Sequence, residues 1–492
     1  MFPAEDGGKH PLFHQALTAA ILDLVASRRR RDPATFSYAG LDLSHAFEVG
    51  MYFSCVHDAA LERLFHNPSE MAAAASLGGL DAMLLARHRF ARGRALAIVN
   101  IRLALYRLAR RIKRGIFPRP SSIDQKQMSH GDAAILFMAR SLRFAQYFRP
   151  FAERLGRDCA FLAPADQPEL LNAISVWGFP CRTYSASAVL EGPLGRALGD
   201  AGKYLAMRAQ SFRTSLTGSS ARLIVVPEGN SPEDEVVHRV AHAQGRKTAC
   251  VQQGWSPIQH PGFRNMSYDL MLVWGDGFAE LLAPTNPAQQ FIAVGNHNLA
   301  ERTDTTTRVG VLFFLQGFSD WLGERSATQA LLLLAEQAAA AMPHIPVYMR
   351  PHPTVPLPSA VVTRLARFPN IRIESPSQIT LAQALAKVPV SVSIYSTTIL
   401  ESIAAGVVPL IFNTTALARY RPDVAAAGAG LEIRDPDEAR QALVALLTDS
   451  AAPARFQVGM QAVAEHFFRY RGDSALDAAC RELRELADGK KG

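Results

Sequence analysis

The stretch VYMRPHP, residues 347–353, is an apolar strand that runs into an Arg-Pro-His-Pro turn. Pro351 and Pro353 fix the backbone on both sides of His352. This geometry would present Arg350 and His352 at the carboxyl end of a strand, which is the edge where open α/β sheets bind ligands. An arginine and a histidine together suit a phosphate group. An ordinary proline-rich loop, in which His352 caps a helix, is the alternative interpretation.

A second stretch, SVSIYSTTILESIAAG at residues 391–406, is a β-branched strand that ends in a hydroxyl cluster where a helix begins. The start of a helix offers free backbone N–H groups and a positive dipole end, which favour phosphate. Ser396 and Thr397 could add side-chain donors, and the carboxylate of Glu401 could accept both hydroxyls of a ribose. The alternative is a plain N-cap at Thr397 or Thr398 with an exposed Glu401.

Short apolar strands alternate with helical stretches on both sides of these motifs, which is typical of a parallel sheet in an α/β domain. The first set of strands is predicted at residues 133–138, 159–162, 223–226, 248–251, 270–273 and 291–294. The second set is predicted at residues 309–315, 347–349, 371–373, 390–394, 408–412 and 430–433. The sequence therefore predicts two α/β halves.

The same pattern gives four regions along the 492 residues. We expect a helical, basic N-terminal region, a Rossmann-like domain for the acceptor, a second Rossmann-like domain for the nucleotide donor, and C-terminal helices. Their predicted bounds are 1–130, 131–300, 301–450 and 451–492. Residues 295–308 form the expected hinge between the two α/β halves.

The paired motifs resemble the histidine-proline and serine motifs of bacterial polysialyltransferases and related capsule enzymes with the GT-B fold, which is two Rossmann-like domains facing a cleft. They are also similar to those of retaining Kdo transferases and of the glycerophosphotransferases of teichoic acid synthesis. In these families the motifs hold the phosphate and ribose of a nucleotide donor, often CMP-linked. The resemblance covers about residues 133–450. It implies that Arg350, His352, Ser396 and Thr397 bind the donor phosphate, and that Glu401 holds the ribose.

The resemblance also points to catalytic residues. Polysialyltransferases carry an acidic pair followed by glycine, and this carboxylate acts as a general base. This chain has Pro227-Glu228-Gly229 after an apolar strand, with one acid lost. Glu228 is therefore the candidate base, a role in the loop being the alternative, and His352 is the second catalytic candidate.

Further candidates follow neighbouring strands. Many enzymes of this class have Gln-His-Gly where this chain has Gln252-Gln253-Gly254, and His260 is the nearby residue that could compensate. Gln316 and Gly317 are expected near the donor phosphate. The residues expected to face the cleft on the acceptor side are Ser141, Arg143, Asn230, Gln253 and Gly254.

The formal net charge of +8 is concentrated in residues 84–119, which hold eleven Lys and Arg and no Asp or Glu. An apolar stripe accompanies these charges, as in a helix that lies on an anionic membrane. A helix packed on its own domain is the alternative interpretation. Nucleic acid is not the expected partner, because no stacking pattern accompanies the charge.

Several classes of site and segment are not expected. The chain has no Asp-x-Asp motif and no Gly-x-Gly-x-x-Gly fingerprint, so we predict neither an essential metal nor a bound cofactor. The five cysteines form no CxxC pair. A signal peptide and a long apolar run are also absent, so a cytoplasmic protein, peripheral on the inner face of the plasma membrane, is expected.

Together these features predict a glycosyltransferase that moves a sugar from a nucleotide-sugar donor to a glycan or lipid-linked glycan of a capsule or lipopolysaccharide. A CMP-linked donor is favoured, and a UDP-linked donor is the alternative. A polyol-phosphate transferase acting on a CDP-alcohol would use the same phosphate motifs. A sugar-nucleotide epimerase would share the fold. A non-catalytic assembly protein held at the membrane is the alternative from another class, because fold alone does not prove activity.

Overall fold

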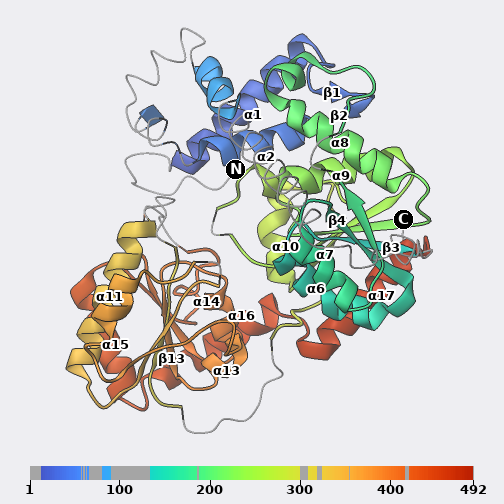
Figure 1. Cartoon of the computed structure of the whole chain (residues 1–492). Helices are drawn as coiled ribbons and strands as arrows, with labels where there is room; N and C mark the ends of the chain where they lie inside the picture. The colour runs from blue at the N-terminus through green and yellow to red at the C-terminus, as the bar shows by residue number, and fades with distance from the viewer. Residues whose placement is uncertain are drawn as a thin grey trace, which may run out of the picture.

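The computed structural model describes residues 13–56, 58, 61, 64–65, 80–89, 133–185, 188–256, 258–299, 308–317, 324–353, 355–415 and 420–490. These residues form two α/β domains, each built on one parallel sheet, with a helical segment beside the first domain (Figure 1). The predicted α/β architecture of two Rossmann-like domains is confirmed.

The N-terminal domain contains a seven-stranded parallel sheet of order β5-β4-β3-β6-β7-β8-β9. Its strands are β3 (Ile135–Met138), β4 (Cys159–Pro164), β5 (Cys181–Tyr184), β6 (Leu223–Pro227), β7 (Lys247–Val251), β8 (Leu270–Val273) and β9 (Phe291–Ala293). Strand order reverses between β3 and β6, which creates the kind of crevice at the carboxyl edge where α/β sheets bind ligands.

Helices cover both faces of this sheet. They are α6 (Leu142–Leu155), α7 (Pro168–Val176), α8 (Lys203–Leu216), α9 (Pro232–Ala243) and α10 (Asp276–Leu282). The strand residues alternate between two cores, because successive side chains of a strand point to opposite faces. Phe137 packs with Phe148 of α6 on one face, whereas Ile224 packs with Val237 of α9 on the other.

The C-terminal domain contains a six-stranded parallel sheet of order β12-β11-β10-β13-β14-β15. Its strands are β10 (Val311–Phe314), β11 (Val347–Arg350), β12 (Ile371–Ile373), β13 (Val390–Ser393), β14 (Val408–Phe412) and β15 (Leu431–Ile433). Its helices are α11 (Glu324–Ala341), α12 (Ser359–Leu365), α13 (Leu381–Leu385), α14 (Thr398–Ala404) and α15 (Pro436–Thr448). Phe314 pairs with both Arg350 and Ser393, so the segments after β10, β11 and β13 leave the sheet at one edge.

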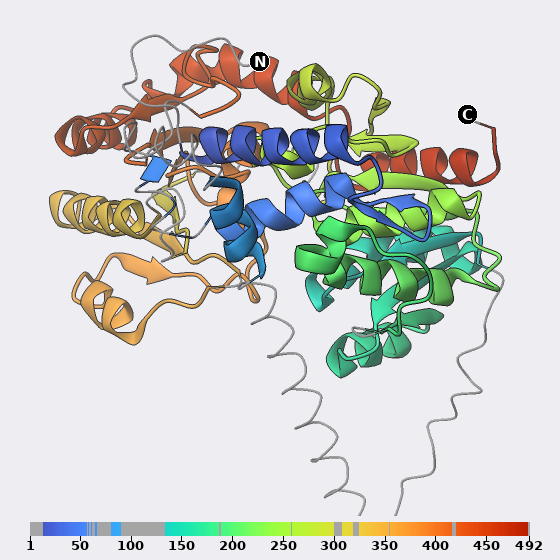
Figure 2. The same ribbon diagram turned by 90° about the horizontal axis from the view of Figure 1, so that it is seen from above.

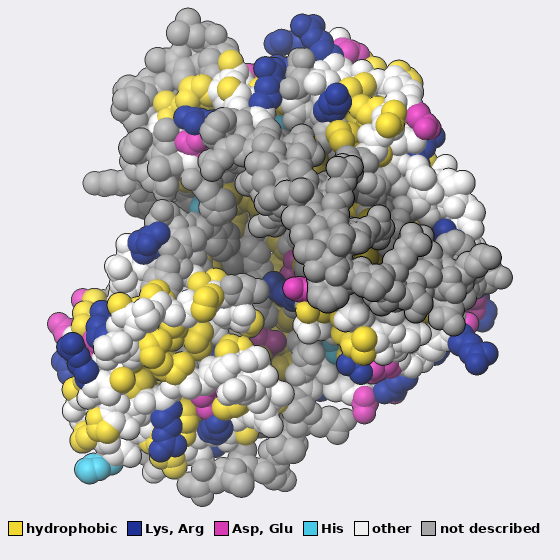
Figure 3. Space-filling view, in the orientation of Figure 1, with side chains coloured by type: hydrophobic (Ala, Val, Ile, Leu, Met, Phe, Trp, Pro, Cys, Tyr) yellow, Lys and Arg dark blue, Asp and Glu magenta, His cyan; other side chains and the backbone are white. Residues whose placement is uncertain are grey.

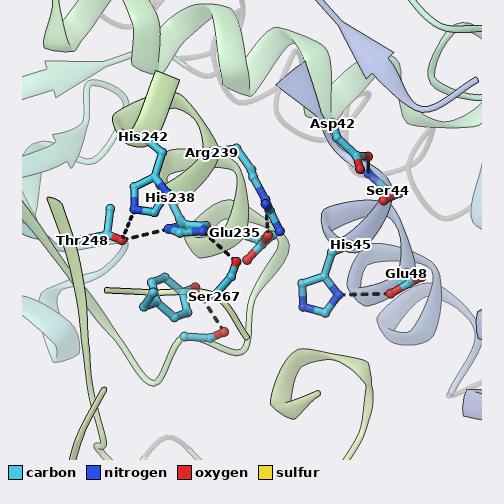
Figure 4. Close-up of polar contacts among 12 residues, drawn as sticks. Asp42, Ser44, His45, Glu48, Glu235, His238, Arg239, His242, Thr248 and Ser267 are labelled. Carbon is cyan, nitrogen blue, oxygen red and sulfur yellow. Dashed lines mark hydrogen bonds and ion pairs between the residues drawn. The ribbon is translucent and has the colours of Figure 1, made fainter. Parts of the chain in front are cut away.

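The described N-terminal residues pack on the first domain. They include α1 (Phe13–Arg31), α2 (Ser44–Cys55), the short antiparallel pair β1 (Ser37–Tyr38) and β2 (Leu41–Asp42), and a helical segment at residues 80–89. A polar network lies where α2 meets α9 (Figure 4): His45 contacts Glu48 at 3.0 Å, and Arg239 pairs with Glu235 at 2.7 Å. Burial lowers the pKa of His45, but the negative charges of Glu235 and Glu48 outweigh this effect, so the pKa is raised.

The predicted membrane-binding stretch 84–119 lies outside the described residues except for residues 84–89. Within those six, Arg87 pairs with Asp58 at 3.1 Å and His88 is buried. In the part of the chain that the structure describes, no helix combines the length and the apolar character needed to cross a bilayer.

The chain crosses between the domains twice. It passes from β9 in the first domain to β10 in the second, and after α16 (Gln457–Phe467) it returns to form α17 (Gly472–Ala487) on the first. Figures 1 and 2 show α17 beside the N-terminal sheet, where Leu483 joins the core under α6. The two crossings touch, because Asn296 bridges to Arg471. A Cβ atom at Gly295 would lie 2.0 Å from the carbonyl oxygen of Tyr470, so only glycine fits there.

Candidate active site between the domains

Glu228 lies in a tight turn after β6. Its backbone has a φ of 59°, a left-handed conformation that residues other than glycine rarely adopt, and Gly229 follows with a φ of 67°. The Glu228 amide donates to the carbonyl of Val251 at 2.9 Å, which ties the turn to the end of β7. Such strain is typical of residues held in place for function, and here the turn directs the carboxylate into a pocket.

Gly229 holds this turn in place, and we predict that Gly229→Ala destabilises the protein. A Cβ atom there would lie 2.7 Å from Cys250 Sγ and 3.0 Å from a Tyr268 ring carbon. We expect the free energy of unfolding to fall by roughly 2–4 kcal/mol, from overpacking together with the left-handed backbone. Gly245→Ala is the matched control, because Gly245 has a φ of 70° but no atom within 4 Å of the added carbon. Equal losses of stability in chemical denaturation would contradict the packing argument.

The pocket beside Glu228 has a volume of about 190 Å³. It brings together five of the predicted site residues of the first domain with one of the second: Arg143, Glu228, Asn230, Gln253, Gly254 and Thr397. The guanidinium of Arg143 donates to Gln253 Oε1 at 3.1 Å and lies 3.9 Å from Glu228 Oε1. This side of the cleft therefore combines a carboxylate with a cation and amides, which can bind and deprotonate a hydroxyl group.

A buried ion pair supports the same edge of the sheet. Arg140, two residues after β3, lies 3.1 Å from Asp234 in the first turn of α9. Burial raises the pKa of Asp234 to about 7, although the Arg140 charge opposes this. Arg140 and Arg143 also lie over the ring of Phe144, at 4.5 and 5.6 Å from its centroid. Sequence analysis missed Arg140, because the residues between the strand and the helix carry no motif that distinguishes it.

On the opposite side of the cleft, the segments after β10, β11 and β13 converge. Gln316 Nε2 donates to the carbonyl of Tyr395 at 2.7 Å, which joins the ends of β10 and β13. His352, two residues after β11, is half-buried, and its carbonyl accepts from the Val355 amide. The carbonyl of Gly317 accepts from Thr328 instead of facing a ligand. Arg350, Gln316, His352 and Ser396 thus share one sheet edge, as the two motifs predicted.

At the ends of β11 and β13, three buried polar atoms have no hydrogen-bond partner within the described residues: Arg350 Nη1, Ser393 Oγ and Thr398 Oγ1. Arg350 is 8% exposed and Ser393 2% exposed. Leaving such groups unpaired costs roughly 1–3 kcal/mol each, more for a charged group, so a polar ligand that paired them would bind well. Sequence analysis missed Ser393 and Thr398, since only their lack of partners distinguishes them from the neighbouring hydroxyls.

The start of α14 is a weaker anion site than the sequence predicted. The helix spans only seven residues, Thr398–Ala404, and Ser396 Oγ already accepts from the Thr398 amide at 3.2 Å. Thr397 Oγ1 is likewise engaged, with the backbone of Trp255. The hydroxyls of Ser396 and Thr397 therefore already have partners, whereas those of Ser393 and Thr398 have none within the described residues.

Glu401 lies one turn into α14, half-buried at the centre of this arrangement. Burial raises its pKa to about 7, whereas the charge of Arg350 and the amide of Asn296 act in the opposite direction. The Glu401 carboxylate thus has Arg350 and Asn296 of the hinge as neighbours. The alternative interpretation, in which Glu401 is exposed, is wrong. Near neutral pH the Glu401 carboxyl is therefore only partly ionised, and its ionised form can accept hydrogen bonds from ligand hydroxyls.

Two sequence candidates lie away from this site. Ser141 occupies the N-cap position of α6 and is not among the residues lining the pocket. His260 is 4% exposed and stacks on Tyr52 at 5.0 Å, and burial lowers its pKa to about 3. It is therefore neutral near pH 7 and does not replace the histidine missing at Gln253.

In the space-filling view the two domains are separate lobes, and acidic and basic side chains lie at their junction (Figure 3). A group of three or more His, Cys, Asp or Glu able to hold a metal ion does not occur among the described residues.

Two Rossmann-like domains facing a cleft, with a C-terminal helix that returns to the first domain, define the GT-B fold. No protein-family model matches the chain, and no curated protein matches it in sequence. Among solved structures, a protein of Listeria monocytogenes, provisionally described as a UDP-N-acetylglucosamine 2-epimerase, is similar at a TM-score of 0.50 and 13% identity over 72% of this chain and 96% of that one.

Two further solved structures have lower scores. MurG of Acinetobacter baumannii is similar at a TM-score of 0.48 and 14% identity, over 72% of this chain and 99% of that one. S. aureus MnaA, in a structure with UDP, is similar at 0.49 and 11% identity, over 72% and 97%. At 13% identity the likeness to the Listeria monocytogenes protein concerns the fold alone.

Proposed function

We propose that the protein is a glycosyltransferase that uses a nucleotide-sugar donor. The observation that carries the proposal is the set of unpaired buried groups, Arg350 Nη1, Ser393 Oγ and Thr398 Oγ1, at the carboxyl edge of one domain. In the other domain a strained turn directs Glu228 into a pocket that Thr397, the neighbour of Thr398, also lines. A phosphate-binding edge facing a general base is what glycosyl transfer requires.

The proposed reaction proceeds across the cleft. Glu228 takes the proton of an acceptor hydroxyl, whose oxygen forms a bond to the anomeric carbon of the sugar. The bond between that carbon and the phosphate oxygen breaks, and its electron pair remains on the departing nucleotide. Arg350 and His352 stabilise the negative charge as it develops, and fixed donors of this kind are worth more in a closed, water-poor cleft.

For the donor we propose a CMP-linked sugar ahead of a UDP-linked one, with the ribose hydroxyls on Glu401. For the acceptor we propose a growing capsule or lipopolysaccharide-type glycan, and no metal requirement. We further propose that the protein works at the cytoplasmic face of the plasma membrane, held there by residues 84–119. These finer assignments rest on the resemblance of the two motifs and on the charge of that stretch.

A thermal-shift comparison of CMP, CDP, UDP and GDP tests nucleotide binding. A ligand at one hundred times its Kd stabilises a protein by about 2.7 kcal/mol, so one nucleotide should raise the Tm by several degrees. The absence of any selective shift would contradict the proposal. Turnover of CMP-sugar against CDP-glycerol then separates sugar transfer from polyol-phosphate transfer. An epimerase would convert the donor sugar in the absence of an acceptor. A non-catalytic scaffold has no turnover to lose, so replacing both Glu228 and His352 by alanine would leave its function unchanged.

The raised pKa of Glu401 predicts that nucleotide affinity rises with pH. Its pKa of about 7 means that the carboxyl is largely protonated below neutral pH, and only the ionised form accepts both ribose hydroxyls. We expect Kd to fall as pH rises from about 6 to 8, and the Glu401→Gln variant to lose this dependence. The phosphate of CMP also titrates near pH 6 and changes Kd in both proteins. The effect of Glu401 is therefore the difference between the calorimetric profiles of Kd against pH for the native protein and for Glu401→Gln. Parallel profiles would contradict the role of Glu401.

A further inference from the structure

Trp255 connects the two domains across the cleft. It follows β7 in the first domain, and its backbone amide donates to Thr397 Oγ1 of the second domain at 2.8 Å. The same hydroxyl donates to the Trp255 carbonyl at 3.3 Å. The indole Nε1 donates to the carbonyl of Arg421 at 2.6 Å. We call these three residues the Trp255 latch.

The indole is held by its own domain. Its ring lies 5.3 Å from the ring of Phe278 on α10, centroid to centroid, and is half-buried. The body of the side chain is therefore anchored in the first domain, and its N–H group reaches the second. Arg421 accepts this hydrogen bond through its backbone carbonyl, so a change of the indole is the direct way to remove it.

The latch adjoins the candidate base. A Cβ atom at Gly254 would lie 3.6 Å from Thr397 Oγ1 and 3.7 Å from Glu228 Oε1, so this one residue separates the latch from the carboxylate. Gln253, the residue before it, binds Arg143. Trp255 and Thr397 of the latch also line the pocket, whose volume of about 190 Å³ is below the roughly 300–1,000 Å³ typical of ligand sites.

From these contacts we infer that Trp255 is a positioning residue: the Trp255 latch holds the two domains closed and sets the distance between Glu228 and the donor-binding edge. The latch must open for a nucleotide sugar to enter and re-form for reaction. Thr397 then serves as a connection between domains in the closed protein, not as a phosphate ligand. The effect on turnover rests on the proposed function, whereas the closure itself does not.

Hydrogen exchange at the residue 255 amide in the ligand-free protein tests the latch directly. We expect this amide to be protected, and to exchange roughly 10-fold faster in Thr397→Val, which removes its acceptor. Trp255→Phe keeps an aromatic ring against Phe278 but loses the indole N–H, and should speed exchange by a few-fold. Thr397→Ser keeps the hydroxyl and should restore protection. Trp177→Phe, on the outer side of the first domain, is the control and should change nothing.

Steady-state kinetics test the positioning role. We expect Trp255→Phe to lower kcat roughly 10-fold, because a small misplacement of reacting groups is costly, while nucleotide Kd stays within about 2-fold. Equal exchange of this amide in the native protein and in Thr397→Val would overturn the latch. Faster exchange with unchanged kcat would overturn the positioning role. Failure of the native protein to bind any nucleotide would count against the proposed function alone, because exchange is measured without ligand.

Discussion

Replacing Glu228 by Gln is expected to lower kcat roughly 100- to 10,000-fold, the usual contribution of a general base. The amide keeps the size of the side chain and the left-handed backbone but cannot take a proton. The Tm and the Kd for the nucleotide should stay close to those of the native protein, because Glu228 lies in the first domain and the nucleotide ligands that we propose lie in the second. Turnover assays and calorimetry measure the two effects separately.

The control for this variant is Glu169→Gln, a change of the same chemistry at the exposed start of α7. It should leave kcat unchanged. If Glu228→Gln retained more than about a tenth of native turnover, the loop role would be the better interpretation of this residue, and the base would have to be sought elsewhere along the cleft.

Replacing Arg350 by Met is expected to weaken nucleotide binding roughly 10- to 100-fold, which corresponds to the loss of a hydrogen bond to a charged group. Arg350 is 8% exposed and has an unpaired Nη1, so it holds a charged donor ready for a ligand. Methionine fills a similar volume without a charge. Arg350→Lys should retain part of the affinity, since it keeps the charge but not the planar fork.

Stability must be followed in the same experiment. Arg350 faces Glu374 and Glu401, so its removal leaves two enclosed carboxylates without that positive neighbour. Arg367→Met, at an exposed position after α12, is the control and should alter neither Tm nor affinity. If Arg350→Met lowered the Tm but bound the nucleotide like the native protein, Arg350 would be a structural cation and not a phosphate ligand.

Much of the fold could be predicted because its strands are buried on both faces. Strands such as β6 and β14 are continuous apolar runs, and the predicted ranges match them to within a residue or two. Strand β5 was missed, since it lies at the edge of the sheet and its sequence CRTY is half-exposed and largely polar. The burial that makes a strand recognisable is absent there.

Within the site, the sequence could indicate which residues share an edge of the sheet, but not which hydrogen-bond partners each side chain has. The register that aligns Arg350 with Ser393 follows from parallel pairing, and the motifs found that edge. No sequence pattern predicts the left-handed backbone of Glu228, because glutamate does not favour this conformation. The role of Trp255 could not be predicted either, since its hydrogen-bond partners come from a distant part of the chain.

The return of α17 to the first domain bears on how the chain acquires its structure during synthesis. Leu476 and Leu483 complete a core whose other members, such as Phe137 and Phe151, are translated more than three hundred residues earlier. The first sheet therefore leaves the ribosome with one apolar face only partly covered, by α6 and α7, until the second domain has also been made. We therefore expect chains stopped before residue 472 to aggregate more readily than the full chain, because the apolar residues that α17 covers stay exposed.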